Sequence, residues 1–251
     1  MDWRTKKQLT LFSVFAVLFI FGVGFFLYKT QPVASCFDNK QNQDETGVDC
    51  GGSQCPACLT ETPKDLITLW TRFFQIRPGI YEVASLIENP NVSLGVKNLA
   101  YTIRLLDEDG KLISIRQGST YVVPSSRFLA YETNIETGAR VPKRVTFTLK
   151  PFSWVITQKP SVAISIVKTV RHFDLDRPQL LVTLGNSSIN NIGHVDLQVV
   201  LVGSDGNAVA VASSQENTVT DSSTADIIFT WPRPFTQGVS STNVYVRQNP
   251  W

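Results

Sequence analysis

Four cysteines lie close together near the amino end of the chain, and the rest of the sequence has none. They are Cys36, Cys50, Cys55 and Cys58. In an oxidising compartment such a group predicts disulfides, because a segment too short to bury a hydrophobic core needs covalent links. The close spacing of Cys55 and Cys58 also suits tetrahedral zinc, but Cys36 and Cys50 lie too far apart to supply a matching pair. We therefore expect disulfides, and the sequence leaves the pairing open.

Oxygen-bearing side chains are dense between the first two cysteines, and carboxylate and amide oxygens are the ligands that calcium prefers. One hypothesis is therefore a calcium site, whose candidate ligands are Asp38, Asn42, Glu45 and Asp49. The alternative is structural, because Asn and Asp side chains bond their own backbone in turns and Gly51 and Gly52 permit positive φ. The spacing does not match the EF-hand loop, and both interpretations stay open.

An uncharged apolar run precedes the cysteines. Residues 9–28 are long enough as a helix to cross a bilayer core, which predicts a transmembrane helix and the lipid bilayer as a partner. Basic residues before the run predict a cytoplasmic stub over residues 1–8, since positive charge stays on the cytoplasmic side. The expected localisation is a single-pass membrane protein whose later domains are extracytoplasmic.

Two alternatives to this anchor remain open. A cleaved signal peptide also has a basic start and an apolar core, although that core is usually shorter. Lipidation at Cys36 is the other, because Val33, Ala34 and Ser35 give the small-residue pattern of a lipidation site.

Short alternating runs of β-forming residues begin near Asp65. One predicted hairpin turns at Asp109-Gly110, and the same pattern returns about 96 residues later at Asp205-Gly206. A repeat of this length indicates a duplicated domain, because solenoid repeats have periods of about 20 to 50 residues. We therefore expect a mainly β fold with one transmembrane helix, a disulfide-rich collar over 29–62, and two tandem antiparallel immunoglobulin-like β-sandwiches over 63–158 and 159–251. The short connection between them predicts a semi-rigid rod.

Two resemblances to known families follow from these residues. The collar is similar to a short cysteine motif of bacterial surface proteins, of the type NxxETxxDCGG, and the matching residues are Asn42, Glu45, Thr46, Asp49, Cys50, Gly51 and Gly52. The tandem copies resemble bacterial immunoglobulin-like modules of the FxLYD and CARDB type, through Leu105, Asp107 and Leu201. The second resemblance implies an extracellular, non-catalytic module.

The sequence offers little for catalysis. It has no HExxH, phosphate-binding loop or Gly-x-Ser-x-Gly elbow, so we predict no enzyme, no catalytic residues and no cofactor besides the candidate calcium. His172 lies near Asp174 and Asp176, and this Asp-rich stretch predicts an exposed segment. The net charge of +2 argues against nucleic acid as a partner. The aromatic and proline cluster over 229–235 is either a ligand platform or a plug at the end of a sandwich.

The function expected from these features is that of a non-enzymatic, membrane-anchored cell-envelope protein. It would serve as a structural or protein-binding subunit with an envelope protein as its partner, for example by strand addition at an unpaired sheet edge. The alternatives are a surface adhesin that binds glycan or another cell, and an accessory subunit of a membrane enzyme or transporter. The sequence leaves the binding residues and the oligomeric state open.

Overall fold

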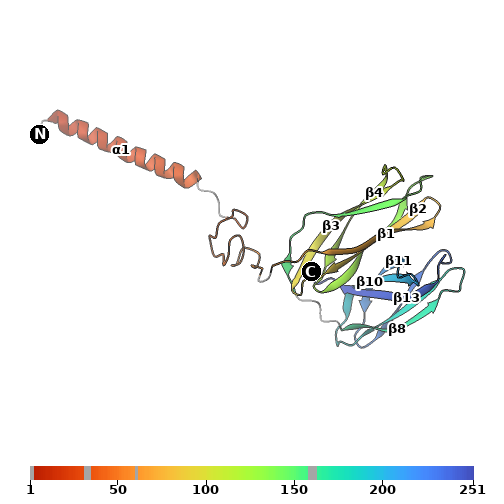
Figure 1. Ribbon diagram of the computed structural model, residues 1–251. Coiled ribbons are helices and arrows are strands. Elements are labelled where there is room, and N and C mark those ends of the chain that lie inside the picture. The colour runs from red at the N-terminus through yellow and green to blue at the C-terminus, as the bar shows by residue number, and fades with distance from the viewer. Residues whose placement is uncertain (1–2, 31–34, 60–61, 158–162) are drawn as a thin grey trace. The chain divides into compact units, whose positions relative to one another are not determined.

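The structure is a computed structural model that describes residues 3–30, 35–59, 62–157 and 163–251 (Figure 1). The chain divides into two compact units, Met1–Cys58 and Leu59–Trp251, and each is held together by its own internal contacts. Two sequence-based expectations fall outside the described residues. One is the pair Val33 and Ala34 of the lipidation pattern, and the other is the boundary between the two sandwiches at residues 158/159.

The first unit contains one long helix, α1, over Trp3–Thr30. Within the described part of the chain, no helix has both the length and the apolar character that crossing a membrane requires. The transmembrane helix predicted over residues 9–28 is therefore wrong. That prediction rested on the length of the uncharged run, whereas α1 begins at Trp3 and also takes in the basic first turns with Arg4 and Lys7.

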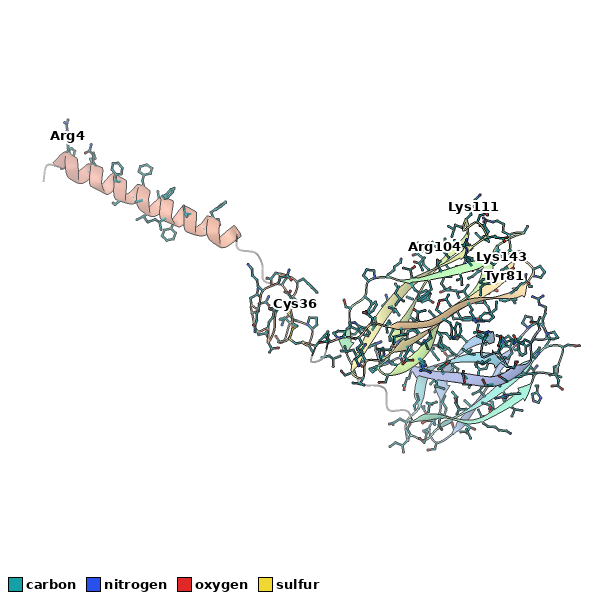
Figure 2. All side chains as sticks on the ribbon, in the orientation of Figure 1. Arg4, Cys36, Tyr81, Arg104, Lys111 and Lys143 are labelled. Carbon is teal, nitrogen blue, oxygen red and sulfur yellow. A yellow bond between two sulfur atoms is a disulfide. The ribbon has the colours of Figure 1, made fainter. Side chains whose placement is uncertain are left out.

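Over residues 35–59, the described part of the collar that follows α1, the chain has neither helix nor strand, and Cys36 lies in this part (Figure 2). Two disulfides hold this segment together, joining Cys36 to Cys55 and Cys50 to Cys58. All four cysteines are thus paired, as the disulfide interpretation expects. A Cys36 sulfur that is bonded to Cys55 has no thiol to offer for lipidation.

The second unit is built from antiparallel strands, and the first seven form one sandwich. These strands are β1 Ile67–Arg77, β2 Ile80–Asn89, β3 Leu94–Leu106, β4 Leu112–Val122, β5 Ser126–Glu136, β6 Arg144–Leu149 and β7 Val155–Ile156. One sheet has the order β1-β2-β5, and the other has the order β4-β3-β6 with β7 beside the start of β3. Their inner faces share a buried core that includes Val83, Ile87, Leu99, Ile103 and Phe128.

The remaining strands repeat this layout in a second sandwich. They are β8 Ile164–His172, β9 Gln179–Asn186, β10 Ile192–Gly203, β11 Ala208–Val219, β12 Thr224–Thr230 and β13 Val239–Gln248. The sheet orders are β8-β9-β12 and β11-β10-β13, which match those of β1-β2-β5 and β4-β3-β6 strand for strand. The structure therefore has the β-sandwich character and the duplication that the sequence predicts.

The predicted hairpin turns lie where the repeat places them. Gly110 between β3 and β4 and Gly206 between β10 and β11 both have positive φ, which glycine adopts without a steric penalty.

A buried asparagine closes the same turn in each sandwich. Asn89 donates from Nδ2 to the carbonyl oxygens of Leu94 and Val123, at 2.7 and 3.0 Å. Asn186 repeats the arrangement by donating to Asn190 and Val219, at 2.8 and 3.1 Å. A primary amide has two donors and can therefore satisfy two buried carbonyls at once. The two copies thus share this pair of buried hydrogen bonds in addition to their apolar pattern.

The two sandwiches pack face to face, so they do not form the extended rod that the short connection predicts. The outer face of sheet β1-β2-β5 lies against the outer face of sheet β11-β10-β13, an arrangement that Figure 1 lets the reader follow. We call this contact the joint. Its buried apolar residues are Ala84, Leu86, Leu129, Val200 and Val211. The strands β2 and β10 are consequently buried on both faces along most of their lengths.

A polar side chain is also buried in the joint and reaches across it. Gln198 of β10 accepts a hydrogen bond from Leu129 N at 2.7 Å and donates one to Leu129 O at 2.8 Å. Leu129 lies on β5, the last strand of its sheet, so this glutamine satisfies backbone groups that no strand pairs with. Such a paired contact fixes the register between the sandwiches more tightly than apolar packing does.

We expect Gln198→Ala to lower the free energy of unfolding of the whole chain by about 2 kcal/mol, because it leaves the N–H and C=O of Leu129 buried without partners. Urea unfolding followed by tryptophan fluorescence measures this change. Gln215→Ala, at an exposed position of β11, is the control and should change stability by less than about 0.5 kcal/mol. Equal effects of the two substitutions would contradict the role given to Gln198.

Candidate functional site

An open groove of about 820 Å³ lies between the sandwiches beside the joint. One wall comes from sheet β1-β2-β5, through Phe74, Glu82, Tyr131 and Thr133. The other wall is the edge strand β11 from Val209 to Ser214, together with residues 228–236 at the end of β12 and beyond. Both sandwiches therefore contribute to one concave surface, and concave surfaces between domains are preferred sites for ligands.

Glu82 is the most unusual group in this groove. It is 8% exposed, and Tyr131 Oη donates a hydrogen bond to its Oε2 at 2.7 Å. Burial raises the pKa of the Glu82 carboxyl to about 7, although the Tyr131 hydrogen bond acts in the opposite direction. Among the described residues the ion pairs are Arg127 with Glu88 and Arg247 with Asp196, so Glu82 has no cationic partner there.

The aromatic and proline cluster over 229–235 contributes both to the core and to the groove. Phe229 and Trp231 are buried, and the rings of Phe173, Trp231 and Phe235 meet edge to face with centroids 5.4 to 6.3 Å apart. These contacts agree with the interpretation as a plug at the end of the second sandwich. Arg233 lies within this segment and donates to Gln75 O at 3.2 Å, which ties the segment to β1.

The edge of β11 is accessible from the groove. Along its length β11 pairs with β10 on one side, and sheet β11-β10-β13 has no described strand on the other side. Trp231 Nε1 donates to Val211 O at 3.0 Å, which shows that this carbonyl points away from β10. Because backbone groups alternate in direction along a strand, those of Ser213 point the same way. Ser213 is exposed, so the edge is accessible at this position, whereas Trp231 covers it at Val211.

The four candidate calcium ligands of the collar lie together, and their carboxylate oxygens accept other hydrogen bonds, whereas Asn42 Oδ1 is buried without a hydrogen-bond partner. Asp49 Oδ1 accepts from the backbone N–H groups of Asp38 and Asn39, at 2.9 and 3.0 Å. Asn42 Nδ2 donates to Asp38 Oδ2 at 2.8 Å, and Asn42 N donates to Glu45 Oε2 at 3.1 Å. The hydrogen bond from Asn42 is the main cause that lowers the pKa of Asp38. These contacts support the structural interpretation of the segment, and the calcium site stays a prediction.

The motif glycines have a geometric role in the same collar. Gly51 and Gly52 both have positive φ, and a Cβ at either position would overlap the side chain of Thr46 or the backbone of Asp44. Glu45 is buried against the Cys36–Cys55 disulfide, with its Oε1 3.1 Å from the Cys55 sulfur. Since a disulfide sulfur carries no proton, this distance is a packing contact. The residues of the motif are therefore those that the fold of the collar itself requires.

The histidine candidate lies in an exposed segment. His172 is exposed at the end of β8, and Asp174 and Asp176 are exposed in the turn that follows. In the described ranges, the group of potential metal ligands that comes together is Cys36, Glu45 and Cys55, whose two sulfurs are joined in the disulfide.

Sequence reasoning missed Glu82, Tyr131 and the edge of β11. A signal for Glu82 is present in hindsight, because it interrupts the apolar run of β2, a strand that is buried on both faces. Gln198 interrupts the run of β10 in the same manner. A polar residue within such a run has to find a partner inside the protein, which makes it a candidate for a special role.

Comparison with known proteins does not assign the chain to a family. No family model and no curated protein matches the chain. Among solved structures, a transglutaminase of red sea bream is similar over 72% of this chain and 31% of its own, with 9% identity and a TM-score of 0.25. A β-glucuronidase from glycoside hydrolase family 2 is similar over 70% of this chain and 21% of its own, with 9% identity and a TM-score of 0.22. The chain thus spans less than a third of either protein, and likeness at this level carries no functional argument.

Glu82→Gln should remove a pH-dependent part of the stability. The folded pKa of about 7 lies above the ordinary value of 4.5, so the contribution of Glu82 is fully present below about pH 4.5 and is lost as the pH rises through about 7. The loss amounts to at most about 3 kcal/mol. We expect Glu82→Gln to stabilise the chain relative to the wild type at about pH 8.5 and to have little effect at about pH 5, as measured by urea unfolding.

Glu88→Gln is the matched control for this measurement, because Glu88 lies on the same strand and pairs with Arg127 at the surface. Glu88→Gln should show the same difference in the free energy of unfolding between the two pH values as the wild type. A Glu82→Gln variant with an unchanged pH dependence would show that Glu82 is not the titrating group.

The two disulfides should differ in how much they stabilise the collar. Cys36 and Cys55 are 19 residues apart, and Cys50 and Cys58 are 8 apart, so the first bond removes more chain entropy from the unfolded state. We expect the double substitution of Cys36 and Cys55 by Ser to cost about 0.8 kcal/mol more than that of Cys50 and Cys58. Hydrogen exchange of the Gly51 amide, which donates to Pro56 O, measures the difference. The reverse order would contradict the entropic argument.

Proposed function

We propose that this chain is a non-enzymatic, extracytoplasmic protein of the cell envelope, and that its paired sandwiches hold a protein partner in the groove between them. The observation that carries the proposal is the joint, because it presents two sheets in a fixed geometry with an open concave surface beside their contact. A preformed groove favours binding, since little conformational entropy is lost when the partner is held.

Contacts across the joint support the idea of a rigid pair. Arg72 of β1 donates to the side chain of Asn207 between β10 and β11, and Arg233 donates to the backbone of Gln75. Together with the pair between Gln198 and Leu129, these hydrogen bonds cross between the sandwiches on several strands. A joint that is held at separate points resists hinge motion, and its groove keeps its shape.

The two disulfides support the proposed location outside the cytoplasm. Bonds of this kind persist in oxidising surroundings outside the cytoplasm and are rare in cytosolic proteins. The resemblance of the collar to a motif of bacterial surface proteins points in the same direction. The proposal therefore places the sandwiches where envelope proteins are available as partners.

Strand addition is the binding mode that suits the groove. The free edge of β11 offers backbone donors and acceptors, and an extended segment of a partner can pair with them as one more strand. The edge at β5 is less suitable, because Gln198 occupies both the N–H and the C=O of Leu129 there, whereas at β11 Trp231 occupies the C=O of Val211. The asymmetry between the two edges selects the groove over the opposite side of the joint.

Site-specific crosslinking in cells tests the proposal. A photoreactive amino acid at Ser213, in the groove, should link the full-length chain to one or a few envelope proteins. The same residue at Thr146, exposed on β6 and outside the groove lining, is the control and should give none of these links. Mass spectrometry of the linked products identifies the partner.

The other outcomes of this experiment are also informative. Identical products from Ser213 and Thr146 would show that the groove is not the binding surface. Polysaccharide at Ser213, with no protein, would support the glycan-binding alternative instead.

A further inference from the structure

We propose that the groove recognises an extended partner segment that carries a lysine or arginine, and that the cationic group of this residue pairs with Glu82 beside Tyr131. This inference rests on the proposed function and specifies the chemistry of the partner. It follows from what lines the groove and from what Glu82 lacks.

The groove contains one acid that no described cation neutralises. Its charged lining residues are Glu82 and Arg233, and the guanidinium of Arg233 is engaged by Gln75 O. Tyr131 is the remaining titratable group of the lining, and it donates to Glu82. On β11 the lining from Val209 to Ser214 has no charge. Among the described lining residues, Glu82 is therefore the acid with which a cation in the groove can pair.

Burial makes this counter-charge effective. An ion pair that is partly shielded from water is stronger than one at the surface, because the effective dielectric constant is lower. Hydrogen bonds to charged groups are also about twice as strong as those between neutral groups. The rings of Phe74 and Tyr131 line the same wall, and aromatic faces attract ammonium and guanidinium groups.

The edge of β11 determines the form of the ligand. A segment paired with this edge is extended, so its side chains alternate between the two faces of the sheet. Those on one face point toward the wall that holds Glu82, and on this face β11 presents Val211 and Ser213, whereas Ala210 and Ala212 pack against the core of the second sandwich. The geometry thus selects a long, flexible cationic side chain on a strand. A bare metal ion is a poorer fit, because a single carboxylate supplies too few ligands.

The pairing has a consequence for pH. Burial raises the pKa of Glu82 to about 7, so the empty groove holds this carboxyl largely protonated in mildly acidic conditions. Binding of a cation favours the ionised form and releases a proton. Affinity should therefore rise as the pH increases through about 7 and fall on acidification.

Selection from a random dodecapeptide library displayed on phage tests the inference, with the full chain as the target at about pH 8. We expect enriched sequences that are rich in β-forming residues and share a lysine or arginine at one position. A synthetic peptide of the enriched sequence should bind Glu82→Gln about tenfold more weakly than the wild type. The same peptide should bind Glu88→Gln as it binds the wild type, since Glu88 is paired with Arg127 outside the groove.

The outcomes separate this inference from the proposed function. Enriched peptides that protect the β11 edge in hydrogen exchange but lack a shared cation, or that bind Glu82→Gln equally well, would overturn cation recognition and leave the groove as a protein-binding site. A selection with no enrichment over the bare support would overturn both. Enriched peptides that leave the exchange of β11 unchanged would show that binding occurs elsewhere on the chain, which also overturns both.

Discussion

The burial of Arg247 in the joint is the constraint on which the arrangement of the two sandwiches depends. This residue of β13 is 5% exposed, and burial lowers the pKa of its guanidinium. It donates to Tyr121 O at 2.9 Å, lies 3.7 Å from Asp196, and stacks on the rings of Tyr121 and Phe128. A buried cation is tolerated only where its partners are in place, so the sandwiches can dock in few orientations. The groove exists because this docking is fixed.

Much of the β fold can be predicted from the sequence, and the joint cannot. Alternation of apolar residues and the glycines of the hairpins predict strands and turns, because both are local properties of the chain. The joint depends on residues such as Leu129 and Gln198, which meet across a long stretch of sequence. Burial on both faces also removes the alternation of β2 and β10, so the apolar pattern does not indicate that one face is covered by a second domain. Glu82 was missed for the same reason, since the other sandwich supplies the opposite wall of the groove that Glu82 lines.

The collar and the groove use acidic side chains in opposite ways. In the collar, Asp49 and Glu45 accept hydrogen bonds from nearby backbone N–H groups, which replace a hydrophobic core in a segment too small to have one. In the groove, Glu82 is held by one tyrosine and no described cation. The first arrangement is structural, whereas in the second the carboxylate has no described cationic partner. The density of acidic residues along the sequence therefore indicated the collar, although the carboxylate with the raised pKa lies in a strand.

The order of the copies along the chain has a consequence for biogenesis. The first sandwich ends with β7, before any strand of the opposing sheet has been synthesised. Until β10, β11 and β13 emerge, the apolar side chains of Trp70, Phe74 and Leu86 face solvent on a folded sheet. Exposed surfaces of this kind promote aggregation during folding. A chain that is truncated between the copies would keep this apolar face exposed.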